Sequence, residues 1–420
     1  MSSRISGFYQ LSPQERLEKV SIFSSLTEEE KNTISALDSF RLEQADRMIE
    51  NVIGTIQIPI GIAVNFKVNN RDVLIPMATE EASVVAAASN AAKYTYEAGG
   101  FHTSYTGSIM RAQVQITNLK NPYYAMAKVL EKKEEILALC NEQDPTLVSL
   151  GGGAQDLEAK VIDGDGEKYL VIHLIVNTLD AMGANAVNTM AEASAPFFEE
   201  LTGGEVVLRI LSNLADKRIV RASARFKNPF EGDEKALKRF KSAYDLATKD
   251  SYRAATHNKG IMNGITAVVL ATGNDTRAIE AGAHAYAARK GHYQSLTTFE
   301  LADNGDIFGT IELPLAVGLV GGATQSHPVA KAATKIMNVD TAEELSGIIA
   351  SVGLAQNFAA LRALATDGVQ KGHMKLHARN LAAMAGAKDD QIEQVIEIAT
   401  KEGKFTFDRI KSIVDQLNQS

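Results

Sequence analysis

The pattern of apolar and polar positions first predicts a β-hairpin near the N-terminal end. Residues 55–68 are rich in Ile and Val, and residues 73–76 are again apolar. The segment Asn69-Asn70-Arg71-Asp72 between them has the composition of a turn. Residues 51–76 are therefore expected to be extended, in two strands.

Helix-start signals lie on both sides of this hairpin. Ser12 with Glu15, and Thr27 with Glu30, have the capping-box spacing that opens a helix. After the hairpin, Thr79 is expected to cap an Ala- and Val-rich helix that Gly99-Gly100 ends. This interpretation places Glu80 and Glu81 in the first helical turn, where a carboxylate complements the helix dipole. A proton-donating Glu81 would also need burial or a neighbouring carboxylate to raise its pKa.

Residues 109–214 follow a different pattern and are expected to form a separate module. The order β-α-β-β-α-β is that of a ferredoxin-like domain. The expected elements are strands at 113–119, 157–162, 168–176 and 206–211, and helices at 122–141 and 184–201.

Residues 215–368 return to a larger mixed body. We expect strands at 218–226 and 311–319 and helices at 278–289 and 342–366. The predicted fold class is α+β: a large mixed α/β substrate-binding domain with an inserted ferredoxin-like cofactor-binding domain and a mobile helical C-terminal segment. The expected boundaries are 1–108 and 215–368 for the large domain, 109–214 for the inserted domain and 369–420 for the C-terminal flap.

Composition narrows the class of protein. The net charge is -8, and no basic stripe with interleaved aromatic residues occurs, which argues against a nucleic-acid partner. No apolar run reaches the roughly 18 residues of a membrane span, and the N-terminus lacks the apolar core of a signal peptide. Cys140 is the only cysteine, so an internal disulfide is excluded. A cytoplasmic enzyme is the simplest class that fits.

Candidate chemistry is concentrated in residues 252–275, which place charged and amide side chains around the apolar run 265–270. The expected path is a loop, then a strand or short buried helix, then a second loop. Lys259 in such a turn can lose solvation and act on a developing oxyanion. The alternative is an ordinary surface lysine.

A second candidate is the turn Asp180-Ala181-Met182-Gly183-Ala184-Asn185, which links a predicted strand to a helix N-terminus. Free backbone N–H groups and the helix dipole favour an anion there. Gly151-Gly152-Gly153 is either a second close-approach loop or a flexible connection.

His373 and His377 have helical i, i+4 spacing, but a metal site is not expected. The H-E-x-x-H pattern and a third ligand are both absent. An acid histidine on a mobile tail is the better functional interpretation, while His377 is otherwise a core or surface residue.

Six motifs in order resemble the 3-hydroxy-3-methylglutaryl-CoA (HMG-CoA) reductases, and the soluble bacterial class II form most. They are ENVIG at 50–54, EEAS at 80–83, DAMGAN at 180–185, ATHNKGIMNG at 255–264, ATGND at 271–275 and GHMKLHARN at 372–380. The resemblance implies interconversion of HMG-CoA and mevalonate plus CoA, in two hydride transfers from NAD(P)H. Ala82 departs from the family, which usually has proline there.

The resemblance also implies roles for individual residues. Lys259 would stabilise the oxyanion and Glu81 would donate a proton to the aldehyde. Asp275 would link Glu81 and Lys259 and keep the pKa of Glu81 high. His373 would protonate the departing CoA thiolate. The substrate contacts implied are Ser83, Arg253, Asn263, Gln356 and His377.

For the cofactor, the resemblance points to Asp144, Asp180, Met182, Gly183, Ala184 and Asn185. A carboxylate at Asp144 would accept the ribose hydroxyls of NAD and repel a 2′-phosphate, so NADH is favoured over NADPH. The alternative is that Asp144, before Pro145, only closes a helix. The family pattern further implies a homodimer with the active site at the subunit interface near ENVIG, or a higher oligomer. The physiological direction stays open.

Two other functions fit the sequence less well. An acyl-CoA reductase with a covalent cysteine thioester would have to use Cys140, which lies in a predicted helix without an adjacent histidine. A regulatory CoA- or nucleotide-binding protein would have lost the chemistry, and the presence of Glu81, Lys259, Asp275 and His373 argues against it.

Overall fold

The computed structural model describes residues 1–36, 39–366, 368, 378–388 and 390–419. The two histidines predicted to act from the tail, His373 and His377, lie outside the described residues.

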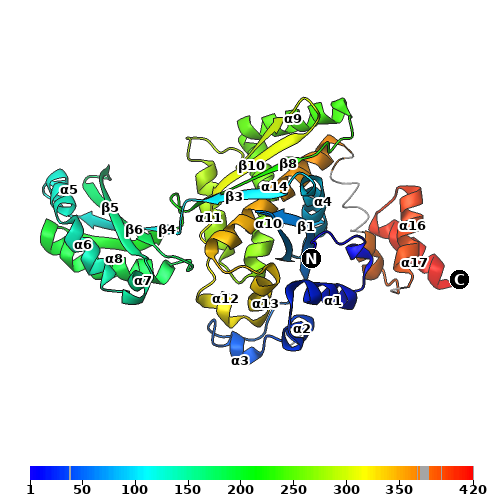
Figure 1. The fold of residues 1–420 in the computed structure, drawn as a ribbon, viewed down its shortest axis with the longest axis horizontal. Coiled ribbons are helices and arrows are strands. Elements are labelled where there is room, and N and C mark those ends of the chain that lie inside the picture. The colour runs from blue at the N-terminus through cyan, green and yellow to red at the C-terminus, as the bar shows by residue number, and fades with distance from the viewer. Residues whose placement is uncertain (37–38, 367, 369–377, 389, 420) are drawn as a thin grey trace.

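A six-stranded mixed sheet forms the main body, with the strand order β2-β1-β3-β8-β10-β9 (Figure 1). Only β1 and β3 run parallel. The predicted hairpin is confirmed: β1 and β2 are antiparallel, and Asn69 and Asn70 take positive φ in the turn between them. The expected strand from residue 55 was too long, since β1 begins only after Pro59, which lacks a ladder donor. The strands are β1 (Ile60–Val68), β2 (Arg71–Ala78), β3 (Phe101–Tyr105), β8 (Ile219–Phe226), β9 (Thr297–Leu301) and β10 (Ile307–Pro314).

Helix α14 is the centre of the main core. It packs against β3, β8 and β10 and also against α4, α9 and α10. It is long and apolar enough to cross a membrane, but 72% of its most apolar window is buried among these elements, as in a core helix. The helices of this body are α4 (Val84–Tyr96), α9 (Glu234–Lys249), α10 (Ser251–Ala271), α11 (Thr276–Ala287), α12 (Gly322–Ser326), α13 (Pro328–Met337) and α14 (Ala342–Ala365).

Residues 251–271 form one continuous helix, α10, so the prediction of a loop followed by a short buried element was wrong. Asp250 caps it by accepting a hydrogen bond from the N–H of Arg253 at 2.7 Å. Gly264 lies against Val352 and Gln356 of α14, where a Cβ would come within 3.0 Å of each side chain. Packing against α14 therefore outweighs the low helix propensity of glycine and asparagine.

Helix α4 begins later than predicted. Its first residue is Val84, with Ser83 before it at φ 76°, so Glu80 and Glu81 lie in a turn outside the helix. Thr79 accepts a hydrogen bond from the N–H of Glu81 at 3.1 Å and so caps this turn instead of the helix. The end near Gly99-Gly100 is as expected, because both glycines take positive φ there.

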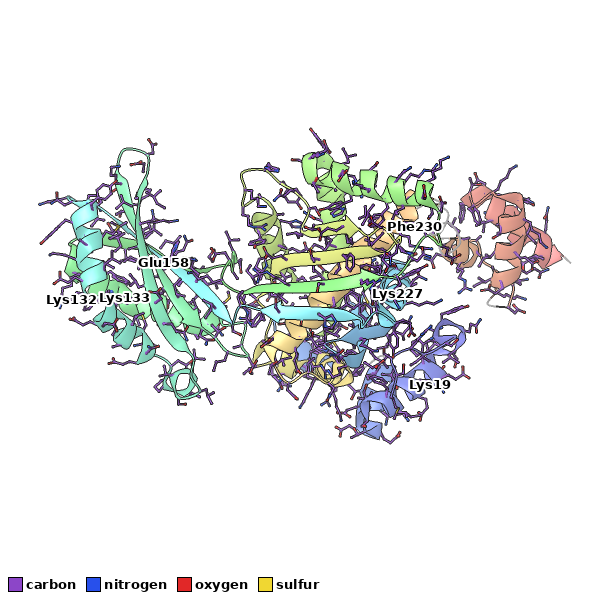
Figure 2. The ribbon with its side chains drawn as sticks, turned by 45° about the horizontal axis from the view of Figure 1, so that its top comes forward. Lys19, Lys132, Lys133, Glu158, Lys227 and Phe230 are labelled. Carbon is purple, nitrogen blue, oxygen red and sulfur yellow. The ribbon has the colours of Figure 1, made fainter. Side chains whose placement is uncertain are left out.

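A second, four-stranded antiparallel sheet with its own apolar core forms a smaller module beside the main body (Figure 1). Its strand order is β5-β6-β4-β7, and the chain enters through β4 and leaves through β7. Lys132, Lys133 and Glu158 lie on this module, away from Lys227 and Phe230 of the main body (Figure 2). The elements are β4 (Ile109–Thr117), α5 (Pro122–Glu131), α6 (Lys133–Asn141), α7 (Pro145–Ser149), β5 (Gly153–Asp163), β6 (Lys168–Asn177), α8 (Ala184–Thr202) and β7 (Glu205–Ser212).

The two ends of the chain add helices outside these sheets. Both predicted capping boxes are confirmed, at Ser12 with Glu15 and at Thr27 with Glu30. The C-terminal helices and the helical residues 378–384 share a small apolar core. The elements are η1 (Phe8–Gln10), α1 (Pro13–Ser24), α2 (Glu28–Ser35), α3 (Leu42–Ala45), α16 (Ile392–Glu402) and α17 (Phe407–Gln419).

Candidate active site

An ion pair between Lys259 and Glu81 lies at the centre of the candidate site. Lys259 Nζ donates to Glu81 Oε2 at 2.9 Å, and Asn263 Nδ2 donates to Glu81 Oε1 at 3.3 Å. Lys259 and Asn263 are four residues apart on α10, so they share one helix face. Residues that lie 178 positions apart in sequence are thus brought together.

Both members of this pair are accessible in the single chain. The Lys259 side chain is 61% exposed and that of Glu81 is 40% exposed. The expected desolvation of Lys259 is therefore not present in one subunit, and its charge is instead balanced by Glu81. In such a pair, the cation can polarise a carbonyl oxygen of a substrate, and the carboxyl group can exchange a proton with the same oxygen.

Of the predicted substrate residues, Asn263 is hydrogen-bonded to this pair. Ser83 lies two residues after Glu81, on the same loop. Arg253 is partly buried, and among the described residues its guanidinium has no ion-pair partner. Gln356 is 6% exposed, and its buried Oε1 has no hydrogen-bond partner there. A half-buried cation and an unsatisfied amide oxygen are both suited to a ligand.

Asp275 has a different environment from the one predicted. Its carboxylate caps α11 by accepting hydrogen bonds from the N–H groups of Arg277 and Ala278, and it pairs with the Arg277 guanidinium. Partial burial raises the pKa of Asp275, but the hydrogen bonds and charge of Arg277 outweigh it, so its pKa lies below the usual value. Within the described part of one chain, Asp275 forms no hydrogen bond to Glu81 or Lys259.

The turn 180–185 opens α8, as the sequence predicted. Gly183 precedes the helix at φ 96°, and a Cβ there would lie 2.2 Å from Thr178 Cγ2. Only glycine fits this position, and the first N–H groups of α8 are left to face an anion. Asp180 has a structural role as well, since its Oδ1 accepts from the N–H of Ala342 at 2.7 Å.

The triple glycine is a close-packed loop. A Cβ on Gly152 would lie 2.8 Å from the carbonyl oxygen of Asn177, at the end of β6. The loop therefore lies beside the strand that leads into the 180–185 turn. Asp144 caps the short helix α7 before this loop, with Oδ1 accepting from the N–H of Leu147 at 2.9 Å. Asp144 thus opens a helix and does not close one.

Two other side chains that could take part in catalysis, Cys140 and His257, are buried in the core. Cys140 is fully buried, and burial raises the pKa of its thiol to about 11, so it is no nucleophile. His257 is buried against Ser295 and Thr297, with Nε2 at 2.8 and 3.0 Å from their hydroxyl oxygens. No cluster of three metal-ligating side chains occurs among the described residues.

Sequence reasoning did not single out Arg218. This residue is fully buried against the 180–185 turn. In sequence it is an ordinary cation before an alternating strand, so no local signal marks it.

Comparison with known proteins places this geometry in a family. The family model for hydroxymethylglutaryl-coenzyme A reductase matches residues 12–378. A 3-hydroxy-3-methylglutaryl-coenzyme A reductase of Archaeoglobus fulgidus is 57% identical over 99% of this chain and 95% of its own length. A probable reductase of the same name from Borreliella burgdorferi is 40% identical over 81% of this chain and 79% of its own.

Solved structures agree in fold. The class II reductase from Streptococcus pneumoniae, bound to NADPH in open conformations, matches with a TM-score of 0.82 and 40% identity. The match covers 97% of this chain and 100% of that one. A second structure of the Streptococcus pneumoniae enzyme gives the same score over 98% of this chain and 99% of its own.

The mixed fold and these matches along nearly the whole chain define an NAD(P)H-dependent oxidoreductase. The chain belongs to the hydroxymethylglutaryl-coenzyme A reductase family, in its class II form. It interconverts HMG-CoA and mevalonate with NAD(P)H, as the sequence motifs predicted.

Proposed function

We propose that the Lys259–Glu81 pair is the catalytic centre of this reaction. The 2.9 Å contact between the two side chains carries the proposal. Hydride addition to the thioester or the aldehyde builds negative charge on oxygen, and Lys259 stabilises that oxygen. Glu81, in its protonated form, gives its proton to the oxygen of the aldehyde as the alcohol forms, and is left as the carboxylate that pairs with Lys259. Asn263 orients Glu81 during both steps.

Asp275 acts on the site of the partner subunit in this proposal. The N–H of Asn274 is bonded to the carbonyl of Val269, which keeps Asp275 near that turn of α10. At a rise of 1.5 Å per residue, Val269 lies about 15 Å along the helix from Lys259. Asp275 therefore lies far from the Lys259 of its own chain and is better placed to couple to a Lys259–Glu81 pair across an interface.

We also propose a homodimer in which the ENVIG segment, residues 50–54, lies at the contact between the subunits. Ile53 is 99% exposed and Ile56 is 92% exposed, and Met48, Ile49 and Ile58 nearby are also exposed. Such a cluster of exposed apolar side chains is typical of a protein interface. We infer that a second subunit covers this segment, and higher oligomers built from such dimers are compatible with it.

Substrate recognition is proposed to use Ser83, Arg253, Asn263, Gln356 and His377. Arg253 supplies an unpaired guanidinium for the HMG carboxylate. Gln356 supplies a buried amide without a partner for its oxygen. Ser83 lies on the loop that carries Glu81.

The small module is proposed to be the inserted ferredoxin-like cofactor domain, 109–214, between the two parts of the large domain, 1–108 and 215–368. The strand order β5-β6-β4-β7 supports this assignment. Asp180, Met182, Gly183, Ala184 and Asn185 would hold the pyrophosphate at the N-terminus of α8. The bound NAD(P)H supplies the hydrides. Asp144 lies at the same end of the module, and its second carboxylate oxygen favours the ribose hydroxyls of NADH over the phosphate of NADPH. We place the enzyme in the cytoplasm.

His373 is proposed to protonate the CoA thiolate from a C-terminal flap, 369–420. An imidazolium near neutral pKa suits a thiolate leaving group. His373→Gln should reduce HMG-CoA reduction by about a hundredfold or more, yet leave reduction of free mevaldehyde within about threefold, because only the first substrate expels a thiolate. Initial rates with the two substrates measure this split. An equal loss with both would contradict the role.

A further inference from the structure

Arg218 connects the cofactor turn to the main body. Its side chain is 0% exposed at the start of β8. Nη1 donates to Thr178 Oγ1 at 3.1 Å and to the carbonyl oxygens of Ala181 at 3.1 Å and Met182 at 3.4 Å. Nη2 donates to the carbonyl of Val317 at 2.5 Å. One guanidinium thus joins the turn after β6 to the segment after β10.

The charge of Arg218 is not neutralised by a carboxylate. In the described part of the chain it forms no ion pair, and its buried Nε has no hydrogen-bond partner. Burial lowers the pKa of the guanidinium, with Tyr105 and Asp180 nearby acting in the opposite direction. Arginine nevertheless remains protonated in proteins. Burying a cation that is stabilised only by dipoles costs free energy. The position of Arg218 behind the 180–185 turn therefore indicates that its charge serves the anion site in front of that turn.

The two carbonyls that Arg218 binds belong to the peptide groups of the turn itself. The Ala181 carbonyl shares its peptide with the N–H of Met182, and the Met182 carbonyl shares its peptide with the N–H of Gly183. A hydrogen bond to the carbonyl polarises the peptide and strengthens its N–H as a donor. Neither N–H donates a backbone hydrogen bond among the described residues. The Met182 nitrogen packs against Gly318, so the Gly183 N–H, directly before α8, is the donor left to face an anion.

The segment 317–320 holds the same turn from the other side. The predicted strand 311–319 was displaced toward the C-terminus, because β10 spans Ile307–Pro314. The N–H of Leu319 donates to the Asp180 carbonyl at 2.8 Å, and Val320 forms a bridge to Ala181. Gly318 is so close that a Cβ would lie 2.4 Å from the nitrogen of Met182. Its own N–H donates to Asn274 Oδ1 at 2.8 Å, next to Asp275.

We propose that Arg218 is the positioning residue of the cofactor turn. It fixes the Ala181 and Met182 carbonyls, and so holds the Gly183 N–H toward the cofactor, and its charge attracts the pyrophosphate from behind the backbone. This inference rests on the proposed role of residues 180–185 in binding NAD(P)H.

The test is a comparison of Arg218→Gln and Arg218→Lys, with Arg221→Gln as the control. Arg221 lies three residues further on, in β8, but is solvent-accessible and paired with Glu312 at 2.6 Å. Loss of charge-assisted hydrogen bonds predicts that R218Q raises KM for NAD(P)H about ten- to hundredfold. R218K should lie between R218Q and wild type. KM for HMG-CoA should stay within about twofold in all three variants, which a merely structural role of Arg218 would not predict.

A further variant separates failure of this inference from failure of the proposed cofactor site. Gly183→Ala places a methyl group against Thr178 and should raise KM for NAD(P)H whatever Arg218 does. If G183A raises it and R218Q and R218K do not, Arg218 has no positioning role. If none of the three changes it, the cofactor binds elsewhere. If R218Q does not fold, R218K decides: a KM for NAD(P)H equal to wild type overturns the inference.

Discussion

At the residue scale, the central feature is a lysine whose partner comes from a distant loop. Lys259 is held by Glu81 at 2.9 Å, and Asn263 on the same helix face holds the second oxygen of Glu81. Both side chains remain accessible, so the pair itself contributes little to stability. In the proposed mechanism, the pair brings a cation and a carboxyl group to one reacting oxygen.

A buried histidine on α10, His257, gives the enzyme a predictable sensitivity to acid. Burial, with a smaller contribution from the charge of Arg253, lowers the pKa of His257 to about 3. Since the unfolded chain binds this proton at higher pH than the folded one, stability is complete above about pH 6.5. Each pH unit below that costs up to about 1.4 kcal/mol. Urea unfolding at neutral and mildly acidic pH should therefore show a smaller loss for His257→Gln than for wild type. Equal losses would refute this assignment.

Individual residues were predictable where a motif carried them. Lys259, Glu81 and Gly183 stand in local sequence patterns. The structure pairs Lys259 with Glu81 and places Gly183 directly before α8. Arg218 could not be found in this way, because its importance depends on the carbonyls of Ala181, Met182 and Val317, which only the tertiary fold brings together. The same holds for the distance between Asp275 and Lys259, which depends on α10 being one straight helix.

At the element scale, the packing of α10 on α14 explains the largest error in the sequence prediction. Local propensity favoured a loop over residues 252–264, since two glycines and two asparagines occur there. The close approach of α14 at Gly264 reverses that preference. The four strands and the second long helix of the small module were predicted because their apolar periodicity is regular. The predicted helix 122–141 is instead two helices, α5 and α6, which are separated at Lys132.

The two glycines of α10 provide a matched test of this packing. In the described part of the chain, nothing outside the local backbone of α10 lies within 4 Å of a Cβ placed on Gly260, whereas one on Gly264 would meet Gln356 Cβ and Val352 Cγ1 at 3.0 Å. Gly260→Ala should therefore stabilise the protein by about 0.5–1 kcal/mol through helix propensity. Gly264→Ala should destabilise it by about 1–3 kcal/mol through overpacking. Denaturant unfolding of both variants measures the difference, and stabilisation by Gly264→Ala would contradict the proposed packing.

At the scale of the whole molecule, the active site requires two chains in this account. We propose that one subunit supplies Lys259 and Glu81 and that the other supplies Asp275 from the N-terminus of α11. The exposed apolar segment around Ile53 and Ile56 is the proposed contact surface. The small module brings the cofactor turn to the edge of the main body, where Arg218 and segment 317–320 hold it.

Complementation between inactive variants tests the shared site. Homodimers of Lys259→Met and of Asp275→Ala should each be nearly inactive. After subunit exchange at equal amounts, about half of the dimers carry one intact site, so roughly a quarter of the wild-type rate should return. The rate of HMG-CoA-dependent NADH oxidation measures this, with each unmixed variant as control. No recovery, despite heterodimers seen by native mass spectrometry, would place both residues in the site of a single chain.

The most direct test of the account is the initial rate of HMG-CoA-dependent cofactor oxidation by wild type and Lys259→Met. It should be measured with NADH and NADPH at equal concentrations. We expect wild type to oxidise both, with NADH preferred, and Lys259→Met to lose about a hundred- to a thousandfold in kcat with its melting temperature retained. A folded Lys259→Met enzyme with a rate near that of wild type would contradict the claim that Lys259 stabilises the oxyanion.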